Sequence, residues 1–274
     1  MEDKDPSCNP MQTERTKKDS GDLSHEIMEG QDKNAMNATS REPASETDYS
    51  NFDIVRATQY GVTERCKELI EAGFDVNQLD REDVSLLHWA AINNRTDLIK
   101  FYISKGAILD RFGGNLNSTP LHWATRQGHL TTVVQLMSYG ADPSLRDGEG
   151  CSCIHLGAQF GHTSIVAYLI AKGQDVNMVD KNGMTPLMWS AYRVFGCDPT
   201  RLLMTFGATV NTGDRLTGNY PLHWACLTGN NIVIKMLLEH GANMDVNNNK
   251  GQSPIDIALE TKTRFLSSGC ENSV

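Results

Sequence analysis

From residue 51 onward, the chain repeats one pattern of apolar and turn-forming residues about every 33 positions. One apolar anchor residue marks each unit, and successive anchors are spaced by 33, 34, 33, 33, 35 and 33 residues: Ile54, Leu87, Leu121, Ile154, Leu187, Leu222 and Ile255. A single unit of this size cannot bury a core alone, so a fixed period predicts units that stack and share their apolar faces. The sequence therefore predicts a repeat array.

Each complete unit has the pattern of a polar turn followed by two helices. Thr119 and Pro120 are typical of a helix start, because threonine caps the first N–H groups and proline loses no hydrogen bond at the first position. The second helix has apolar residues on one face, as in Val133 and Leu136. A glycine suited to left-handed geometry then ends it. These glycines are Gly73, Gly106, Gly140, Gly173, Gly207 and Gly241.

The units begin near residues 51, 84, 118, 151, 184, 219 and 252. We expect about six full repeats and an incomplete seventh, because "TKTRFLSSGCENSV" after the last anchor lacks the apolar spacing of a second helix. Residues 51–260 are thus assigned to the repeats and residues 261–274 to a divergent tail. Residues 1–50 contain 12 acidic and 6 basic residues with few apolar ones, which predicts a disordered acidic segment.

The charge pattern and the apolar runs exclude several classes of partner. The formal net charge is −9 and no block of lysine and arginine occurs, which argues against nucleic acid as a partner. No apolar run is long enough to span a membrane, and no signal segment begins the chain, so we expect no direct membrane insertion and a cytoplasmic location. The seven cysteines form no C-x-x-C pair, so we expect reduced thiols, with Cys66 and Cys226 as small core residues.

Four histidines recur once per unit: His88, His122, His155 and His223. Stacked helices lie about 8–10 Å apart, so neighbouring imidazoles are too distant to share a metal ion at bonds of about 2 Å. We expect each imidazole to bond the helix-start Thr or Ser and the next turn. No nucleotide-binding, nucleophile-elbow or zinc-protease motif occurs. The sequence therefore predicts no catalytic residue, no metal site and no cofactor in this chain.

All four tryptophans follow an anchor residue by two positions: Trp89, Trp123, Trp189 and Trp224. At 100° per residue, Trp123 lies about 200° around the helix from Leu121, opposite the core side. The residue four positions later shares that outward face. The predicted site on this face contains Tyr60, Trp89, Asn93, Trp123, Gln127, Phe160 and Trp189. Its rings could pack on an extended peptide whose backbone the amides bond, surround a methylated lysine, or serve only as a packed wall.

Thr119-Pro120-Leu121-His122, the following Gly128-His129 and Gly140-Ala141-Asp142, at this period, resemble the ankyrin repeat. The resemblance covers residues 51 to about 260. It implies an all-α solenoid whose first helices line a concave face. The ring-bearing face would then be the concave one.

The run from Ser85 to Asn177, with "LLHWAAINN" and "TPLHWATRQGH", resembles the ankyrin domain of the huntingtin-interacting DHHC-type palmitoyl acyltransferases. In that family the array recruits substrates for a membrane-embedded Asp-His-His-Cys domain at Golgi-type membranes, where palmitoyl-CoA and zinc act. The resemblance implies a site for short disordered segments ending in Gln-Pro, built from an asparagine and a tryptophan that match Asn93 and Trp123. The partners it implies are huntingtin and proteins that become palmitoylated.

Asp-His-His-Cys does not occur in this sequence, and neither do membrane spans. We therefore expect a partner-recruiting module without enzymatic activity. The sequence resembles a shortened product of a longer gene, such as an alternative transcript. Two other functions stay open: a purely structural scaffold, and a soluble competitor that withholds substrates from the full-length enzyme. The turn of unit 5 and Leu156 with Gly157 in unit 4 depart from the pattern, so we expect the groove to be best formed at units 2 and 3.

Overall fold

The computed structural model describes residues 49–192 and 198–270, and the segment from Tyr49 onward forms one compact unit. Most of the expected acidic segment (residues 1–48), the unit 5 turn (193–197) and the last four residues lie outside the described residues. Within the described ranges, all regular elements are helices, and one isolated bridge joins Gly113 to Ser118. The predicted all-α fold is confirmed.

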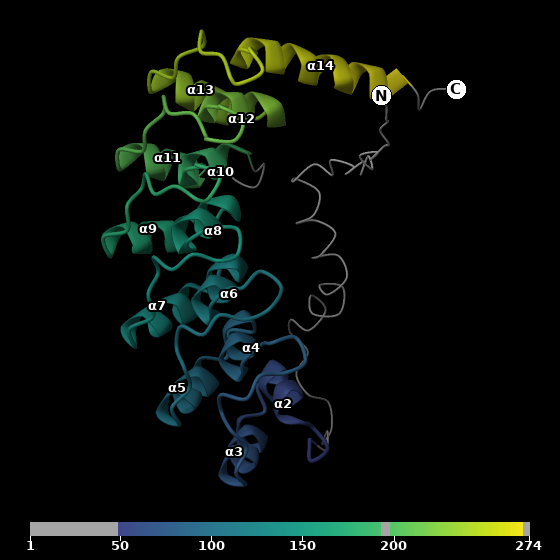
Figure 1. Cartoon of the computed structure of the whole chain (residues 1–274), viewed down its shortest axis with the longest axis vertical. Coiled ribbons are helices and arrows are strands. Elements are labelled where there is room, and N and C mark those ends of the chain that lie inside the picture. Colours follow the sequence, from purple (N-terminus) through teal and green to yellow (C-terminus); the bar gives the residue numbers. More distant parts are fainter. Residues whose placement is uncertain (1–48, 193–197, 271–274) are drawn as a thin grey trace, which may run out of the picture. The chain divides into compact units, whose positions relative to one another are not determined.

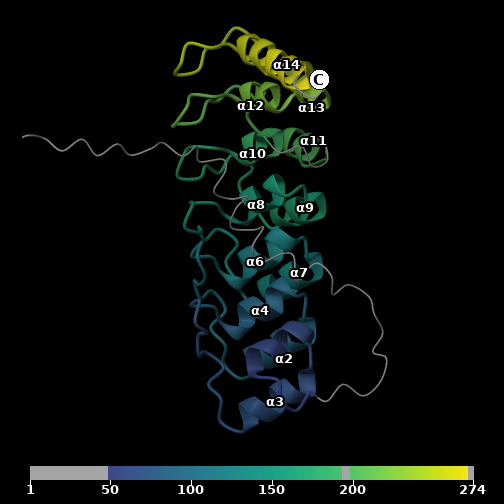
Figure 2. The same ribbon diagram turned by 90° about the vertical axis from the view of Figure 1, so that its right-hand side faces the viewer.

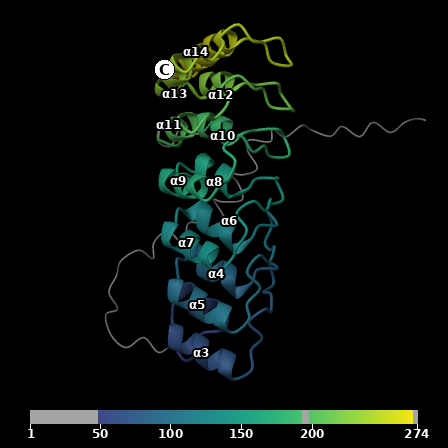
Figure 3. The same cartoon turned by 90° about the vertical axis from the view of Figure 1, so that its left-hand side faces the viewer.

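Two rows of helices build the stack (Figure 1). The first helices of the units are α2 (Ile54–Tyr60), α4 (Leu86–Ile92), α6 (Pro120–Gln127), α8 (Cys153–Gln159), α10 (Pro186–Tyr192), α12 (Pro221–Thr228) and α14 (Pro254–Cys270). The second helices are α3 (Thr63–Glu71), α5 (Thr96–Ser104), α7 (Leu130–Ser138), α9 (Thr163–Ala171), α11 (Asp198–Thr205) and α13 (Asn231–Glu239). Each first helix packs on the first helices of its neighbours, as Figures 2 and 3 show from opposite sides.

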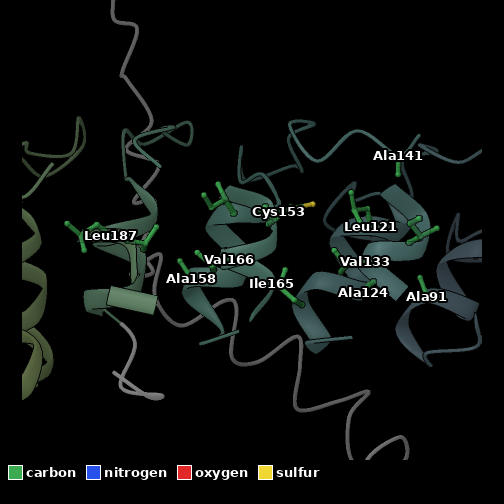
Figure 4. Close-up of a cluster of buried hydrophobic side chains, with 14 of the residues drawn as sticks. Ala91, Leu121, Ala124, Val133, Ala141, Cys153, Ala158, Ile165, Val166 and Leu187 are labelled. Atoms are coloured by element: carbon green, nitrogen blue, oxygen red, sulfur yellow. The ribbon is translucent and has the colours of Figure 1, made fainter. Parts of the chain in front are cut away.

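The core lies between the two rows and continues from unit to unit. Leu121 and Ala124 of α6 are fully buried together with Val133 of α7, and the next unit adds Ile165 and Val166 of α9 (Figure 4). Small residues alternate with branched ones here, which lets helices approach closely without leaving voids. The predicted core cysteines are confirmed, because Cys66 and Cys226 are buried and belong to this cluster.

The recurring histidines connect each unit to the turn that follows it. In α6, the Thr119 backbone N–H donates to Nδ1 of His122 at 3.2 Å, and the Thr119 hydroxyl lies 2.8 Å from the same nitrogen. Because Nδ1 accepts, Nε2 carries the proton and donates to the Leu145 carbonyl at 3.0 Å. His88, His155 and His223 make equivalent bonds to the Ser118, Met178 and Gln252 carbonyls. The predicted structural role of these histidines is confirmed.

The last helix extends into the segment assigned to the divergent tail. Helix α14 continues without a break from Pro254 to Cys270. The physical reason is that Glu260, Lys262, Arg264 and Leu266 are good helix formers, and no proline interrupts them. The seventh unit therefore has an extended first helix in place of the turn that should start a second one.

Amide side chains in the turns form a second link between units. Asn77 donates from Nδ2 to the Gly106 carbonyl at 3.0 Å, and its Oδ1 accepts the Ile108 N–H at 2.8 Å. Asn177 and Asn211 repeat both bonds in later units. The equivalent residue of the second unit is Asp110, whose carboxylate accepts only the Asp142 N–H among the described residues, and whose pKa is raised by burial. A carboxylate has no N–H to donate to the Gly140 carbonyl.

Replacing Asp110 with asparagine is therefore expected to stabilise the protein by about 1 kcal/mol, the usual contribution of one additional hydrogen bond. The measurement is the free energy of unfolding from urea titrations at pH 7. The matched control is Asn177→Asp, which removes the equivalent donor and should lower that free energy by a similar amount. An unchanged Asp110→Asn midpoint would contradict this interpretation of the link.

Candidate functional site

The predicted site residues lie on the row of first helices, outside the core. Tyr60 is 57% exposed, and the side chains of Trp89, Trp123, Phe160 and Trp189 are partly buried. Asn93 and Phe160 are the C-caps of α4 and α8, and Gln127 is the last residue of α6. Like the rings, Asn93 and Gln127 are partly buried. All seven residues are thus open to solvent to some degree.

The rings form separate groups rather than one ladder. Trp89 and Trp123 meet edge to face, with centroids 5.8 Å apart. Tyr60 packs instead on Phe52 at 5.6 Å. Unit 4 interrupts the row, because Leu156 is only 1% exposed and the Phe160 ring lies under the Arg126 guanidinium at 5.4 Å.

A third ring group occupies units 5 and 6. Tyr192 lies 6.3 Å from Trp189 and 5.1 Å from Trp224, again edge to face. Sequence reasoning missed Tyr192 and Phe52 as members of these groups. Their signal was present, because Tyr192 follows Trp189 by three positions and so lies on the same helix face. The residue predicted to share that face, Arg193, lies outside the described residues.

The indole N–H groups of the tryptophans differ in what they bond. Trp89 donates to Asp80 Oδ2 at 2.8 Å, and Trp189 donates to Asp180 Oδ2 at 3.0 Å. Both aspartates lie nine positions before their tryptophan and close the turn that precedes the helix. Those two N–H groups are used within the fold. The Trp224 N–H is buried and unpaired among the described residues.

Trp123 is different because its turn has glycine where the others have aspartate. Gly113 makes the turn-closing bonds with Ser118, as Asp80 does with Val84 and Asp180 with Met184. A Cβ at Gly113 would lie 2.4 Å from the Asp83 carbonyl oxygen, so this position cannot carry an aspartate without a shift of backbone. In the part of the chain that the structure describes, no acceptor bonds the Trp123 N–H, and this atom is not buried.

Two contacts fix the orientation of the Trp123 ring. His88 of the neighbouring unit lies edge to face on it at 5.2 Å, and Trp89 contacts it from α4. A Cβ built on Gly114 would approach the indole at 3.0 Å, so the backbone of the turn lies close against the ring. The ring is therefore held in place before any ligand arrives, which lowers the entropy cost of binding.

Asn93 lies one helix away from Trp123 and is held by the same tryptophan pair. Its Nδ2 donates to the Trp89 carbonyl at 2.9 Å, which leaves Oδ1 as an acceptor without a hydrogen-bond partner in the described ranges. Helices α4 and α6 pack directly on each other. Together Asn93 and Trp123 offer one acceptor, one N–H donor and one ring face, all uncharged.

The described residues show no arrangement typical of a metal site or a membrane span. No group of three or more His, Cys, Asp or Glu side chains in residues 49–192 and 199–262 is placed to hold an ion. Burial lowers the pKa of His88, His122 and His155 to about 4, so these imidazoles are neutral at pH 7. None of the helices in the described part has both the length and the apolarity needed to cross a bilayer.

Comparison with known families and proteins agrees with this architecture. A family model described as "Ankyrin repeats (3 copies)" matches residues 54–147, 131–214 and 195–271. The chain is 71% identical to palmitoyltransferase ZDHHC17 of Homo sapiens over 219 residues, which are 80% of this chain and 35% of that protein. It is 59% identical to palmitoyltransferase ZDHHC13 of Homo sapiens over 236 residues, or 86% of this chain and 38% of that protein. The chain thus spans little more than a third of these relatives.

Two solved structures share the stack of helix pairs. The human ASB11 ankyrin repeat domain superposes with a TM-score of 0.67 at 29% identity, covering 76% of this chain and 92% of that one. The ankyrin repeat domain of Bcl-3 gives a TM-score of 0.63 at 21% identity, covering 76% and 94%. The second likeness concerns the fold alone. Helix pairs, family model and relatives together show that this chain belongs to the ankyrin-repeat family and is homologous to the ankyrin region of the ZDHHC17 and ZDHHC13 palmitoyltransferases.

Proposed function

We propose that this array recruits protein substrates or partners by binding short extended segments that contain Gln-Pro. The site consists of Asn93 and Trp123, with Trp89 and Gln127 beside them. The observation that carries the proposal is the Trp123 indole, which is fixed by its neighbours while its N–H has no acceptor in the described part of the chain. Tyr60, Phe160 and Trp189 flank this centre and contribute less.

The chemistry of the pair matches an extended peptide with a proline. A proline ring packs well on a flat aromatic face, and it has no N–H that would need a partner there. The Asn93 Oδ1 accepts a backbone N–H, and the Trp123 N–H donates to a backbone carbonyl. An extended segment presents both groups at regular intervals because it has no internal hydrogen bonds.

The names of the relatives suggest what recruitment is for. In a palmitoyltransferase, an array that holds a substrate segment raises the local concentration of the acceptor cysteine near the catalytic centre. We propose that this chain performs the recruiting step and that transfer belongs to the catalytic domain of full-length relatives. Huntingtin and palmitoylated substrates are the proposed partners. A form made of the array alone would then compete with a full-length enzyme for the same segments.

The ring geometry argues against two alternatives. An aromatic cage for methylated lysine needs space between its rings, whereas Trp89 and Trp123 are in direct edge-to-face contact at 5.8 Å. A purely structural role fits Trp89 and Trp189, whose N–H groups are bonded to aspartates of the preceding turns. A purely structural role does not explain why the Trp123 N–H has no acceptor among the described residues.

The test is a titration with a peptide ending in Gln-Pro, followed by calorimetry. Trp123→Ala is expected to weaken binding by about 2 kcal/mol or more, roughly 30-fold, as for a hot-spot tryptophan. Trp189→Ala is the matched control, because it removes an equivalent ring two units away and should weaken binding far less than Trp123→Ala does. Trp123→Phe keeps a ring and removes the N–H, so it should give an intermediate loss.

Two outcomes would overturn the proposal. One is a wild-type chain that does not bind the peptide at all. The other is a pair of variants, Trp123→Ala and Trp189→Ala, that bind as tightly as the wild type. Thermal unfolding of each variant, followed by circular dichroism, confirms that the array is intact in every titration.

A further inference from the structure

The C-terminal end of the repeats carries an apolar groove that the proposed peptide site does not use. The groove has a volume of about 340 Å³ and lies along α13 and α14, with part of its floor from α12. Its lining includes Leu222, Cys226, Ile234, Leu238, Met244 and Ile255. Helix α14 lies at the end of the stack, over α12 (Figure 2).

Comparison with the other units shows why this surface is open. Ile255 is the anchor residue of the seventh unit and is 50% exposed. At the same position, Leu121, Ile154 and Leu187 are fully buried. In those units the second helix of the same unit packs over the first helix. Ile255 thus stands at a core position, but the described residues contain no second helix of the seventh unit that would cover it.

The second helices show the same difference. The fourth residue of α5, α7 and α9 is Ile99, Val133 and Val166, and each of these is fully buried. Each of those helices contacts the second helix of the next unit. The equivalent residue of α13, Ile234, is only partly buried, and Leu238 one turn later is 37% exposed. No second helix follows α13 within residues 198–270.

We infer that this groove binds one amphipathic helix of a partner protein, seated where the second helix of a seventh unit would lie. The inter-unit packing surface of the array continues into the groove, so its complement has the same chemistry as the array's own second helices. Those second helices bury two adjacent apolar residues and a large apolar residue three positions after the second of them. In α9 these are Ile165, Val166 and Leu169, all fully buried. Burying such a face is the main driving force for a helix in a groove.

A positive charge at one side of the groove favours an acidic residue on the bound helix. Lys262 belongs to the lining and is exposed. An acidic residue on the flank of the bound helix would pair with this ammonium without entering the apolar floor. The partner helix is therefore expected to be apolar on one face and acidic beside it, which separates it from the uncharged extended segment proposed for Asn93 and Trp123.

The probe for this inference is a peptide that copies residues 161–174, which contain α9 with its buried Ile165, Val166 and Leu169. Isotope-labelled protein is titrated with this peptide and followed by NMR, because a free helix of this length is only partly formed and will bind weakly. We expect saturable shifts in the amides of α13 and α14. The same peptide with Val166→Asp should produce none of them.

Two protein variants make the test specific to the groove. Ile255→Glu places a charge on an exposed groove residue and is expected to weaken the peptide about 10-fold or more. Ile232→Glu is the matched control, because Ile232 is 59% exposed on α13 but does not line the groove, so binding should not change. Both positions are exposed, and a melting curve checks that each variant folds as the wild type does.

Three results would overturn the inference: no saturable shift, shifts confined to other helices, or equal binding by wild type and Ile255→Glu. Sedimentation velocity tests whether a second copy of this chain, rather than a partner protein, occupies the groove. A wild-type dimer that Ile255→Glu converts to a monomer would assign the groove to self-association instead. None of these results depends on the Trp123 site.

Discussion

Lowering the pH from 7.5 to 4.5 is expected to destabilise the repeats by several kcal/mol. Burial holds the pKa of His88, His122 and His155 at about 4, against an ordinary value of 6.5. Between these two values the unfolded chain binds protons that the folded chain does not, so the free energy of unfolding falls as the pH falls. The contribution is fully present above pH 6.5 and is lost as the pH falls through about 4. A shift of this size corresponds to roughly 3 kcal/mol per histidine.

The measurement is the free energy of unfolding from urea titrations at several pH values between 7.5 and 4.5. The chain itself offers the comparison, because unit 5 has Met188 where units 2, 3, 4 and 6 have histidine, and its sulfur lies 3.4 Å from the Thr185 backbone nitrogen. His122→Met should lower the stability at pH 7.5 and remove about a third of the pH dependence from these three histidines. Identical slopes for wild type and His122→Met would refute the assignment to buried imidazoles.

The second large effect concerns the glycine in the turn between successive units. Gly150 has a φ of 81°, and a Cβ there would lie 2.7 Å from the backbone nitrogen of Lys181 in the next unit. Gly251 occupies the same place in the last turn with a φ of 73°, and a Cβ there would meet nothing within 4 Å. The two positions share the backbone conformation and differ in whether the described residues include a further turn stacked on them.

Gly150→Ala is therefore expected to cost about 3 kcal/mol, and Gly251→Ala only about 1 kcal/mol. Both substitutions include the cost of left-handed geometry for an L-residue, roughly 1 kcal/mol. Gly150→Ala adds a collision with backbone that moves only if two units separate, and such overpacking costs about 1–3 kcal/mol. Urea titrations of the two variants side by side measure the difference. Equal losses would mean that the units are not in close contact at this turn.

Much of the fold was predictable from the sequence because the same rules apply in every unit. The anchor period located the first helices, and Thr119, Pro120 and the glycines located their starts and the ends of the second helices. The length of α14 was not predictable from the sequence pattern, because a missing apolar pattern does not indicate whether a helix stops. Continuation depended on the good helix formers after Glu260 and the lack of a proline.

The site was predictable only as a helix face. Stepping 100° per residue places every ring outward, but it does not say which ring touches which or which N–H is already bonded. Those differences come from the turn before each helix, where Asp80 and Asp180 accept a hydrogen bond from an indole N–H and Gly113 has no side chain to do so. An aspartate nine residues before a tryptophan is the signal that would have distinguished Trp89 and Trp189 from Trp123. Whether Trp123 binds a peptide stays a prediction.

The methionine of unit 5 has a consequence for communication along the array. In units 2, 3, 4 and 6 an imidazole bonds the following turn, whereas within the described residues Met188 makes no such bond to the turn of unit 6. The boundary between units 5 and 6 therefore lacks one hydrogen bond that joins the units around it. Trp123 lies on one side of that boundary and the C-terminal groove on the other. We therefore expect the two surfaces to be occupied independently, with little cooperative free energy passing between them.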